Sequence, residues 1–262
     1  MKRIITTILS LYAGVLFAKG DAASESKKDT LYFNRTYVMT AQGQIMANSE
    51  LKRMSYYTDK GIEFVEDNVT VMNYPDGEGG THVNKTEENY KCIAGEIVKY
   101  VGKYTENDSI TEMKAELYNK HFKIYGKLAG GNMSEWMSVD KDKYDFLIIF
   151  LPLSKIDLTK KVNHRKLIDI YDMRMRDVRI EFLGSEKVTV AGEEFDCTMI
   201  NFDNGAIEGK LWMSKDETGT FFLVKEEAIH RENGPFEMMM TDFSRTNPNK
   251  KIDAPKAGEF GF

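Results

Sequence analysis

The chain has few of the residues that form disulfide scaffolds or metal sites. Its 262 residues include two cysteines, four histidines and five prolines. Two cysteines cannot form the dense disulfide network of a small secreted domain. The histidines, His82, His121, His164 and His230, are far apart, and none has the i, i+4 spacing of a helical zinc motif. We therefore expect neither a metal nor another cofactor.

Motifs for nucleophilic and phosphate chemistry are also missing. There is no Gly-x-Ser-x-Gly, and the segment from Gly205 to Lys210 is one residue short of a phosphate-binding loop. Ser24 and Lys27 match Ser-x-x-Lys, but they lie in a polar segment where nothing would bury the lysine. The sequence therefore favours a protein that is not an enzyme. A hydrolase with a dispersed active site stays open as an alternative, since catalytic triads are recognised in space.

The charged residues argue against polyanionic partners. Acidic residues outnumber basic ones by 41 to 36, which gives a formal net charge of −5. A protein that binds nucleic acid or an anionic membrane would need basic patches to release counterions. The acidic pairs Glu193–Glu194 and Glu226–Glu227 lie in predicted strands, so the members of each pair should point to opposite faces. Neither pair should share a substrate.

The N-terminus has the order of charge and hydropathy that is typical of a secretory signal peptide. Lys2 and Arg3 precede an uncharged, mostly apolar run over residues 4–18. This run is shorter than the ~20 residues of a membrane-spanning helix. Ala18 and Gly20 supply the small residues of a cleavage site. The mature chain should therefore carry no transmembrane helix.

Three segments follow from this pattern. We expect residues 1–20 to be a signal peptide, residues 21–29 a flexible polar leader, and residues 30–262 a single β-rich domain. The protein should be exported to the periplasm or the medium.

Alternation of apolar and polar residues predicts strands at both ends of this domain. Between residues 31 and 74 the pattern suits short strands, and a turn rich in proline and glycine follows at residues 74–80. A second strand region begins near residue 173 and extends to about 243, with a hairpin turn at Ala191–Gly192. Short strands separated by turn residues predict an antiparallel sheet.

The middle of the chain has a different period. Apolar residues recur at i, i+3, i+4 and i+7 over residues 87–104, which predicts an amphipathic helix. Ser109 and Glu112 form a capping-box pattern at the start of a second predicted helix, residues 110–129, on which His121 falls in the apolar stripe. The fold class expected is therefore α+β, a mainly antiparallel sheet that forms an incomplete barrel with two helices against its concave face.

The C-terminal strands carry a resemblance to a known family. The segments Phe182–Cys197, Gly209–Asp216 and Leu223–Lys225 resemble a family of bacterial cell-envelope proteins of unknown function. That family is similar to the outer-membrane lipoprotein carriers, whose fold is an incomplete antiparallel barrel wrapped around helices with an apolar cavity. The resemblance covers residues 142–243 and implies no catalytic residue.

These observations favour an exported, non-enzymatic envelope protein that binds a lipid, a lipoprotein or another apolar partner. Period two places the predicted ligand-binding side chains on one face of two strands, where methionines would adapt to a variable ligand: Leu211, Met213, Phe236, Met238 and Met240. The alternative is a structural or assembly component of the envelope whose cavity is filled by its own side chains. The sequence leaves the ligand and the oligomeric state open.

The two cysteines are expected to stay unlinked. The predicted helix places Cys92 on its polar face, whereas Cys197 shares a strand face with Phe195 and Met199. Two thiols in these positions could not reach the Cα separation of about 4.4–6.8 Å that a disulfide needs.

N-terminal sequencing tests the export prediction. Protein recovered from the envelope or the medium should begin near Asp21, because cleavage follows Gly20. A cytoplasmic protein that retains Met1 would contradict the predicted signal peptide.

Overall fold

The computed structural model describes residues 30–75, 81–94, 96–106, 109–119, 121–128, 131–138, 144–146, 159–169 and 174–246. The predicted signal peptide and leader lie outside the described residues. Within these ranges the regular structure consists of fifteen β-strands: β1 (Leu31–Ala41), β2 (Gln44–Thr58), β3 (Gly61–Pro75), β4 (Thr81–Ile93), β5 (Glu96–Glu106), β6 (Ser109–Tyr118), β7 (His121–Leu128), β8 (Gly131–Ser138), β9 (Tyr144–Phe146), β10 (Val162–Asp169), β11 (Arg174–Val190), β12 (Glu193–Asp203), β13 (Ile207–Lys215), β14 (Phe221–His230) and β15 (Gly234–Thr246).

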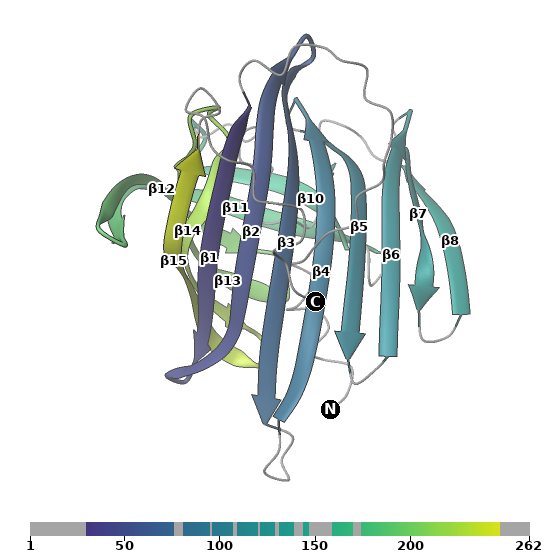
Figure 1. Ribbon diagram of the computed structural model, residues 1–262, viewed down its shortest axis with the longest axis horizontal. Helices are drawn as coiled ribbons and strands as arrows, with labels where there is room; N and C mark the ends of the chain where they lie inside the picture. The colour runs from purple at the N-terminus through teal and green to yellow at the C-terminus, as the bar shows by residue number, and fades with distance from the viewer. Residues whose placement is uncertain are drawn as a thin grey trace.

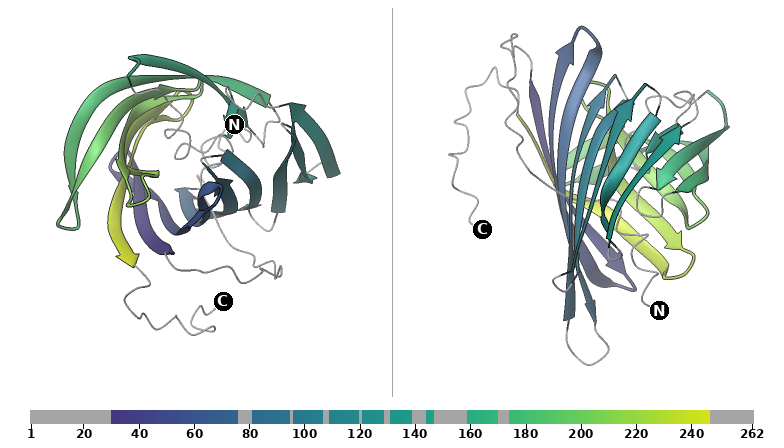
Figure 2. Two further views of the ribbon diagram at one scale, coloured as in Figure 1. Left: turned by 90° about the horizontal axis from the view of Figure 1, so that it is seen from above. Right: turned by 90° about the vertical axis from the view of Figure 1, so that its right-hand side faces the viewer.

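All fifteen strands belong to one sheet. Their order is β8-β7-β6-β5-β4-β3-β2-β1-β15-β14-β13-β12-β11-β10-β9, so β1 and β15 join the two halves of the chain. The pairing is antiparallel throughout, except that β9 runs parallel to β10. The sheet curls around an interior, and β8 and β9 form its two ends (Figures 1 and 2). The mainly antiparallel sheet expected from the sequence is therefore present, as one open and curled sheet.

The α+β class and the two predicted helices are wrong, because no helix occurs among the described residues. Residues 87–104 form parts of β4 and β5, which meet in a turn at Ala94, where φ is 50°. Buried Thr86, Glu88, Tyr90 and Cys92 alternate along β4. Because polar residues share this buried face, hydropathy does not reveal the period of two, and the apolar residues that remain mimic a helical stripe.

The second predicted helix is likewise replaced by two strands and a turn. Residues 110–129 fall on β6 and β7, which are joined by a turn at Asn119, where φ is 43°. The supposed capping box at Ser109 is the start of β6. His121, expected in the core, is exposed at the start of β7.

The predicted C-terminal strands are confirmed. β11 to β15 form an antiparallel meander, and β11 and β12 meet in a tight hairpin turn at Ala191 and Gly192. Both turn residues have positive φ, 50° and 85°, as a two-residue hairpin loop with the twist of the strands requires.

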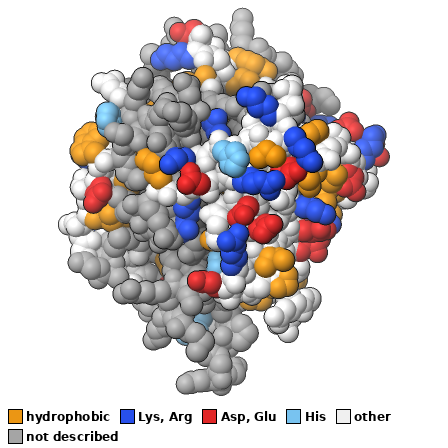
Figure 3. Space-filling view, turned by 180° about the vertical axis from the view of Figure 1, so that it is seen from behind, with side chains coloured by type: hydrophobic (Ala, Val, Ile, Leu, Met, Phe, Trp, Pro, Cys, Tyr) orange, Lys and Arg blue, Asp and Glu red, His pale blue; other side chains and the backbone are white. Residues whose placement is uncertain are grey.

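The inner face of the curled sheet is polar to an unusual degree. The strand register aligns five buried hydroxyl-bearing residues in one row across β1 to β5: Tyr37, Ser49, Thr70, Thr86 and Tyr104. Ser49 and Thr70 are hydrogen-bonded at 2.8 Å, and the Tyr37 hydroxyl donates to the carbonyl of Leu223 at 2.7 Å. Seen from behind, the described residues form a mixture of acidic, basic and scattered hydrophobic side chains (Figure 3).

A buried charge cluster, Arg35, Arg53, Glu66 and Asp216, connects the two halves of the sheet. The Glu66 carboxylate accepts hydrogen bonds from Arg35 at 2.5 Å, from Arg53 and from the Tyr90 hydroxyl. Arg53 also donates to Asp216 at 3.1 Å, 163 residues away in sequence. Arg35, Arg53 and Glu66 are at most 2% exposed and Asp216 is 9% exposed, so the four charges compensate one another out of water.

The cluster keeps Glu66 ionised. Burial by itself would raise the pKa of the Glu66 carboxyl, but the charges of Arg35 and Arg53 and the hydrogen bond from Tyr90 lower it to about 2. A carboxyl whose pKa is lowered by folding stabilises the folded state above its unfolded pKa of about 4.5, and this contribution is lost as pH falls towards 2.

Replacement of Glu66 by glutamine should therefore destabilise the protein by about 3–5 kcal/mol at pH 7, because Arg35 loses its carboxylate partner and Arg53 keeps only Asp216. Urea unfolding measures the difference. Glu50→Gln is the matched control, since its pair with Lys52 is solvent-exposed and should contribute less than about 1 kcal/mol. The gap between wild type and Glu66→Gln should narrow as pH falls below about 4.5, and a gap independent of pH would contradict this account.

Candidate functional site

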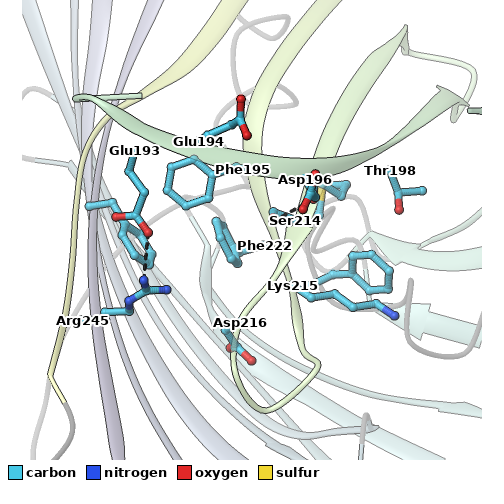
Figure 4. Close-up of a pocket in the computed structure, with 13 residues that line it drawn as sticks. Glu193, Glu194, Phe195, Asp196, Thr198, Ser214, Lys215, Asp216, Phe222 and Arg245 are labelled. Atoms are coloured by element: carbon cyan, nitrogen blue, oxygen red, sulfur yellow. Dashed lines mark hydrogen bonds and ion pairs between the residues drawn. The ribbon is translucent and has the colours of Figure 1, made fainter. Parts of the chain in front are cut away.

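A cavity of about 490 Å³ lies between β12 and the hairpin of β13 and β14, next to the end of β15 (Figure 4). Its lining residues come from four strands and one turn: Glu193, Glu194, Phe195, Asp196, Thr198, Met213, Ser214, Lys215, Asp216, Phe221, Phe222, Phe243 and Arg245. This volume is within the range of small-molecule sites.

The floor of the cavity is an aromatic cluster of Phe195, Phe222 and Phe243. The rings of Phe222 and Phe243 are stacked with centroids 5.6 Å apart, and Phe195 meets both rings edge-on at 5.9 and 5.3 Å. Phe195 and Phe222 are buried, while Phe243 is partly exposed. Such a floor offers apolar contact area that is already ordered before a ligand arrives.

Charged residues surround this floor in pairs. Arg245 bridges Glu193 at 3.0 Å and Glu217 at 2.9 Å, and Lys187 pairs with Glu194. Lys215 places its ammonium 4.7 Å from the centre of the Phe221 ring. The rim is therefore polar and wet, whereas the floor is apolar.

The Asp216 carboxylate fixes the turn at the bottom of the cavity. Its Oδ1 accepts hydrogen bonds from the backbone N–H groups of Thr218 at 2.9 Å and Thr220 at 3.0 Å. Its Oδ2 accepts from Arg53, so the turn is attached to the buried charge cluster. The position of the cavity wall thus depends on strand β2, far away in sequence.

The five residues predicted to bind a ligand lie together on the inner face, as period two requires. All of them are buried, with exposed fractions from 0% for Met213 and Met238 to 9% for Phe236. Met238 pairs with Met39 and Met240 with Tyr37, so both belong to the core of the β1–β15 junction. Of the five, Met213 lines the cavity.

Sequence reasoning missed the aromatic floor because of β-bulges. Along β15, Phe236, Met238 and Met240 point inward. The pairing register of β15 with β1 then shifts next to Tyr37, and beyond this shift Phe243 pairs with Arg35. A bulge adds one residue, so an odd-numbered residue joins a face built from even-numbered ones. A second shift leaves an extra residue on β14, because Trp212 pairs with Lys225 and Met213 with Leu223.

The acidic pairs behave differently from each other. Glu226 is buried and Glu227 exposed, as the sequence predicts for neighbours on a strand. Glu193 and Glu194, in contrast, are both among the residues that line the cavity. They lie next to the hairpin turn, where the start of β12 passes over the cavity (Figure 4).

Glu226 is an isolated carboxyl within the predicted ligand face. It lies between Leu211 on β13 and Met238 on β15 and is 1% exposed. Its Oε2 has no hydrogen-bond partner in the described part of the chain. Burial raises the pKa of the Glu226 carboxyl to about 8, so the group is mostly protonated at neutral pH.

The histidines and cysteines form no common site among the described residues. His82, His121 and His164 are exposed and His230 is buried, and the described residues contain no group of three potential metal ligands. Cys92 and Cys197 are both buried on the sheet, and within the described ranges neither forms a disulfide. The sequence predicted Cys92 on the polar face of a helix. In the structure it lies on β4 and faces the interior.

Comparison with known proteins gives a likeness in fold. No family model and no curated protein matches the sequence. The structure is similar to a β-barrel-like protein of a domain of unknown function, DUF1849, from Brucella abortus, with a TM-score of 0.55 and 7% identity over 83% of this chain and 98% of the other. At this identity the likeness concerns the fold alone.

Two further solved structures are more distant. One is a protein named as exported, with a YmcC-like fold, from Bacteroides fragilis; its TM-score is 0.32 and its identity 11%, over 89% of this chain and 99% of the other. The other is a protein named as a lipoprotein from Parabacteroides distasonis; its TM-score is 0.32 and its identity 12%, over 83% and 96% of the two chains. At these TM-scores neither adds to the description of the fold.

Replacement of Glu226 by glutamine should remove a pH dependence of stability. The folded state binds this proton more tightly than the unfolded chain, so the free energy of unfolding should fall as pH rises from about 4.5 to about 8, by up to about 1.4 kcal/mol per pH unit. Urea unfolding at pH 5, 6.5 and 8 should show the fall in wild type and not in Glu226→Gln. Glu227→Gln, on the exposed face, should behave as wild type; a parallel fall in all three proteins would refute the assignment.

Proposed function

We propose that this protein is an exported, non-enzymatic component of the bacterial cell envelope that binds the apolar part of a lipid, a lipoprotein or another partner. The binding site is the cavity between β12 and the β13–β14 hairpin. The observation that carries the proposal is the ordered aromatic floor of Phe195, Phe222 and Phe243 beneath an open, charged rim.

The chemistry of the floor and rim suits an amphiphilic ligand. An acyl or aromatic group in contact with the three rings and Met213 would leave water, which favours binding by about 25 cal/mol per Å² of apolar surface. The polar end of the ligand would stay at the rim, near Lys215, Arg245 and the carboxylates of β12. The resemblance to lipoprotein carriers makes an acylated protein one candidate.

Export rests on the N-terminal pattern of residues 1–20, and the absence of an enzymatic role rests on the missing motifs. The described part of the chain has no helix long and apolar enough to cross a membrane.

A purely structural role is the second candidate, and one observation favours it. Leu211, Met238 and Met240, predicted to contact a ligand, are at most 1% exposed within the core. If the cavity at the rim takes up no ligand, the interior of the sheet serves only to stabilise the fold.

Filling the cavity separates the two candidates. Thr198→Trp should place an indole in the cavity and lower the affinity for the apolar probe N-phenyl-1-naphthylamine at least tenfold, measured by fluorescence titration. Thr40→Trp, on β1 and away from the cavity, is the matched control and should bind the probe as wild type does.

Two outcomes would count against ligand binding at this cavity. Equal affinity of wild type and Thr198→Trp would place the probe elsewhere. Failure of wild type to take up the probe, together with no lipid in native mass spectra of protein purified from its own envelope, would favour the structural role.

A further inference from the structure

Strands β6 to β8 form one end of the sheet (Figure 1), and their outward-facing positions carry a cluster of exposed aromatic residues. Trp136 on β8 is 59% exposed and Tyr118 on β6 is 48% exposed, and their ring centroids lie 5.9 Å apart. Between them on β7, Lys123 places its ammonium 5.8 Å from the Trp136 ring and 5.4 Å from the Tyr125 ring. We call Tyr118, Lys123, Tyr125 and Trp136 the edge patch.

The surroundings of the edge patch are basic, although the protein as a whole is acidic. Buried residues alternate along β5, β6 and β7, so the intervening positions face outward. Among the outward positions whose side chains the structure describes are five lysines and two glutamates: Lys99, Lys103, Lys114, Lys123, Lys127, Glu112 and Glu116.

Three of these lysines have no carboxylate partner among the described residues. Lys99 pairs with Glu116 at 3.3 Å and Lys103 with Glu87 at 3.3 Å. Lys114, Lys123 and Lys127 form no ion pair within the described ranges. The positive surplus is therefore concentrated beside the exposed rings, in contrast to the mixed charges on the opposite face (Figure 3).

We propose that the edge patch docks the protein on the surface of an anionic lipid bilayer. Tryptophan and tyrosine prefer the boundary between headgroups and acyl chains, where the ring is apolar and the N–H or O–H stays wet. Lysines around them extend their ammonium groups to lipid phosphates. The overall negative charge argued against such a partner, but the distribution of charge, not its sum, decides what this face attracts.

Vesicle co-sedimentation tests the proposal with the purified protein as the cell processes it. Binding to vesicles with 30% phosphatidylglycerol should be at least tenfold stronger than binding to pure phosphatidylcholine, and it should weaken in high salt. The variant Lys114→Gln, Lys123→Gln, Lys127→Gln should bind both kinds of vesicle equally weakly. The variant Tyr118→Ser, Trp136→Ser should lose at least tenfold in affinity for the anionic vesicles.

Matched controls separate docking from general effects of charge and hydropathy. Lys60→Gln, Lys166→Gln, Lys210→Gln changes the net charge equally but at other sites, and Ile45→Ser, Tyr57→Ser removes two side chains that are 60% and 59% exposed. Both controls should bind as wild type does, with unchanged circular dichroism. Equal losses in controls and patch variants would overturn the proposal. The proposal would also be overturned if the wild type did not bind vesicles but formed dimers that Trp136→Ser dissociates. The patch would then join two copies of the chain.

Discussion

The burial of one carboxylate, Glu66, between two guanidinium groups is the constraint on which the curled sheet depends. Arg35, Arg53 and Glu66 come from three adjacent strands, and Arg53 also reaches Asp216 in the turn between β13 and β14. A single buried charge without its partners costs several kcal/mol, so these groups leave water together or not at all. Strands β1 to β3 and the β13–β14 turn must therefore be in place at the same time. The fold achieves this long-range connection with ion pairs, and neither Cys92 nor Cys197 contributes a disulfide within the described residues.

The candidate ligand site is coupled to the same cluster. Asp216 orders the turn at the base of the cavity and pairs with Arg53, while the Arg35 guanidinium lies 5.4 Å from the centre of the Phe222 ring. A ligand on the aromatic floor would thus contact a ring that also covers a buried charge. Glu226, on the same inner face, shows the opposite case: among the described residues no cation pairs with it, so burial raises the pKa of its carboxyl and the group is mostly protonated. The interior therefore holds ionised groups where partners exist and a protonated one where they do not.

The sequence predicted the elements whose two faces differ clearly in polarity. The hairpin at Ala191–Gly192 and the strands from β11 to β15 were predicted because apolar residues alternate there and the turn residues accept positive φ. Residues 87–104 were wrongly assigned to a helix because the buried face of β4 carries Glu88 beside Tyr90 and Cys92. A polar interior removes the hydropathy contrast on which the period of a strand is recognised. The floor of the cavity was missed for a geometric reason, since a bulge on β15 turns Phe243 to the face of Met238 and Met240.

The sequence by itself determined the properties that depend on near neighbours: strands where polarity alternates, turns where glycine accepts positive φ, and the common face of Leu211 and Met213 or of Met238 and Met240. The tertiary structure decided everything that depends on distant partners. The pairing of β1 with β15 brings the two halves together, and the contact of Arg53 with Asp216 across 163 residues compensates charges buried on the polar inner face. The physical reason is that the cost of burying a polar side chain depends on the groups it meets in space. The local sequence does not indicate which distant strand supplies these partner groups.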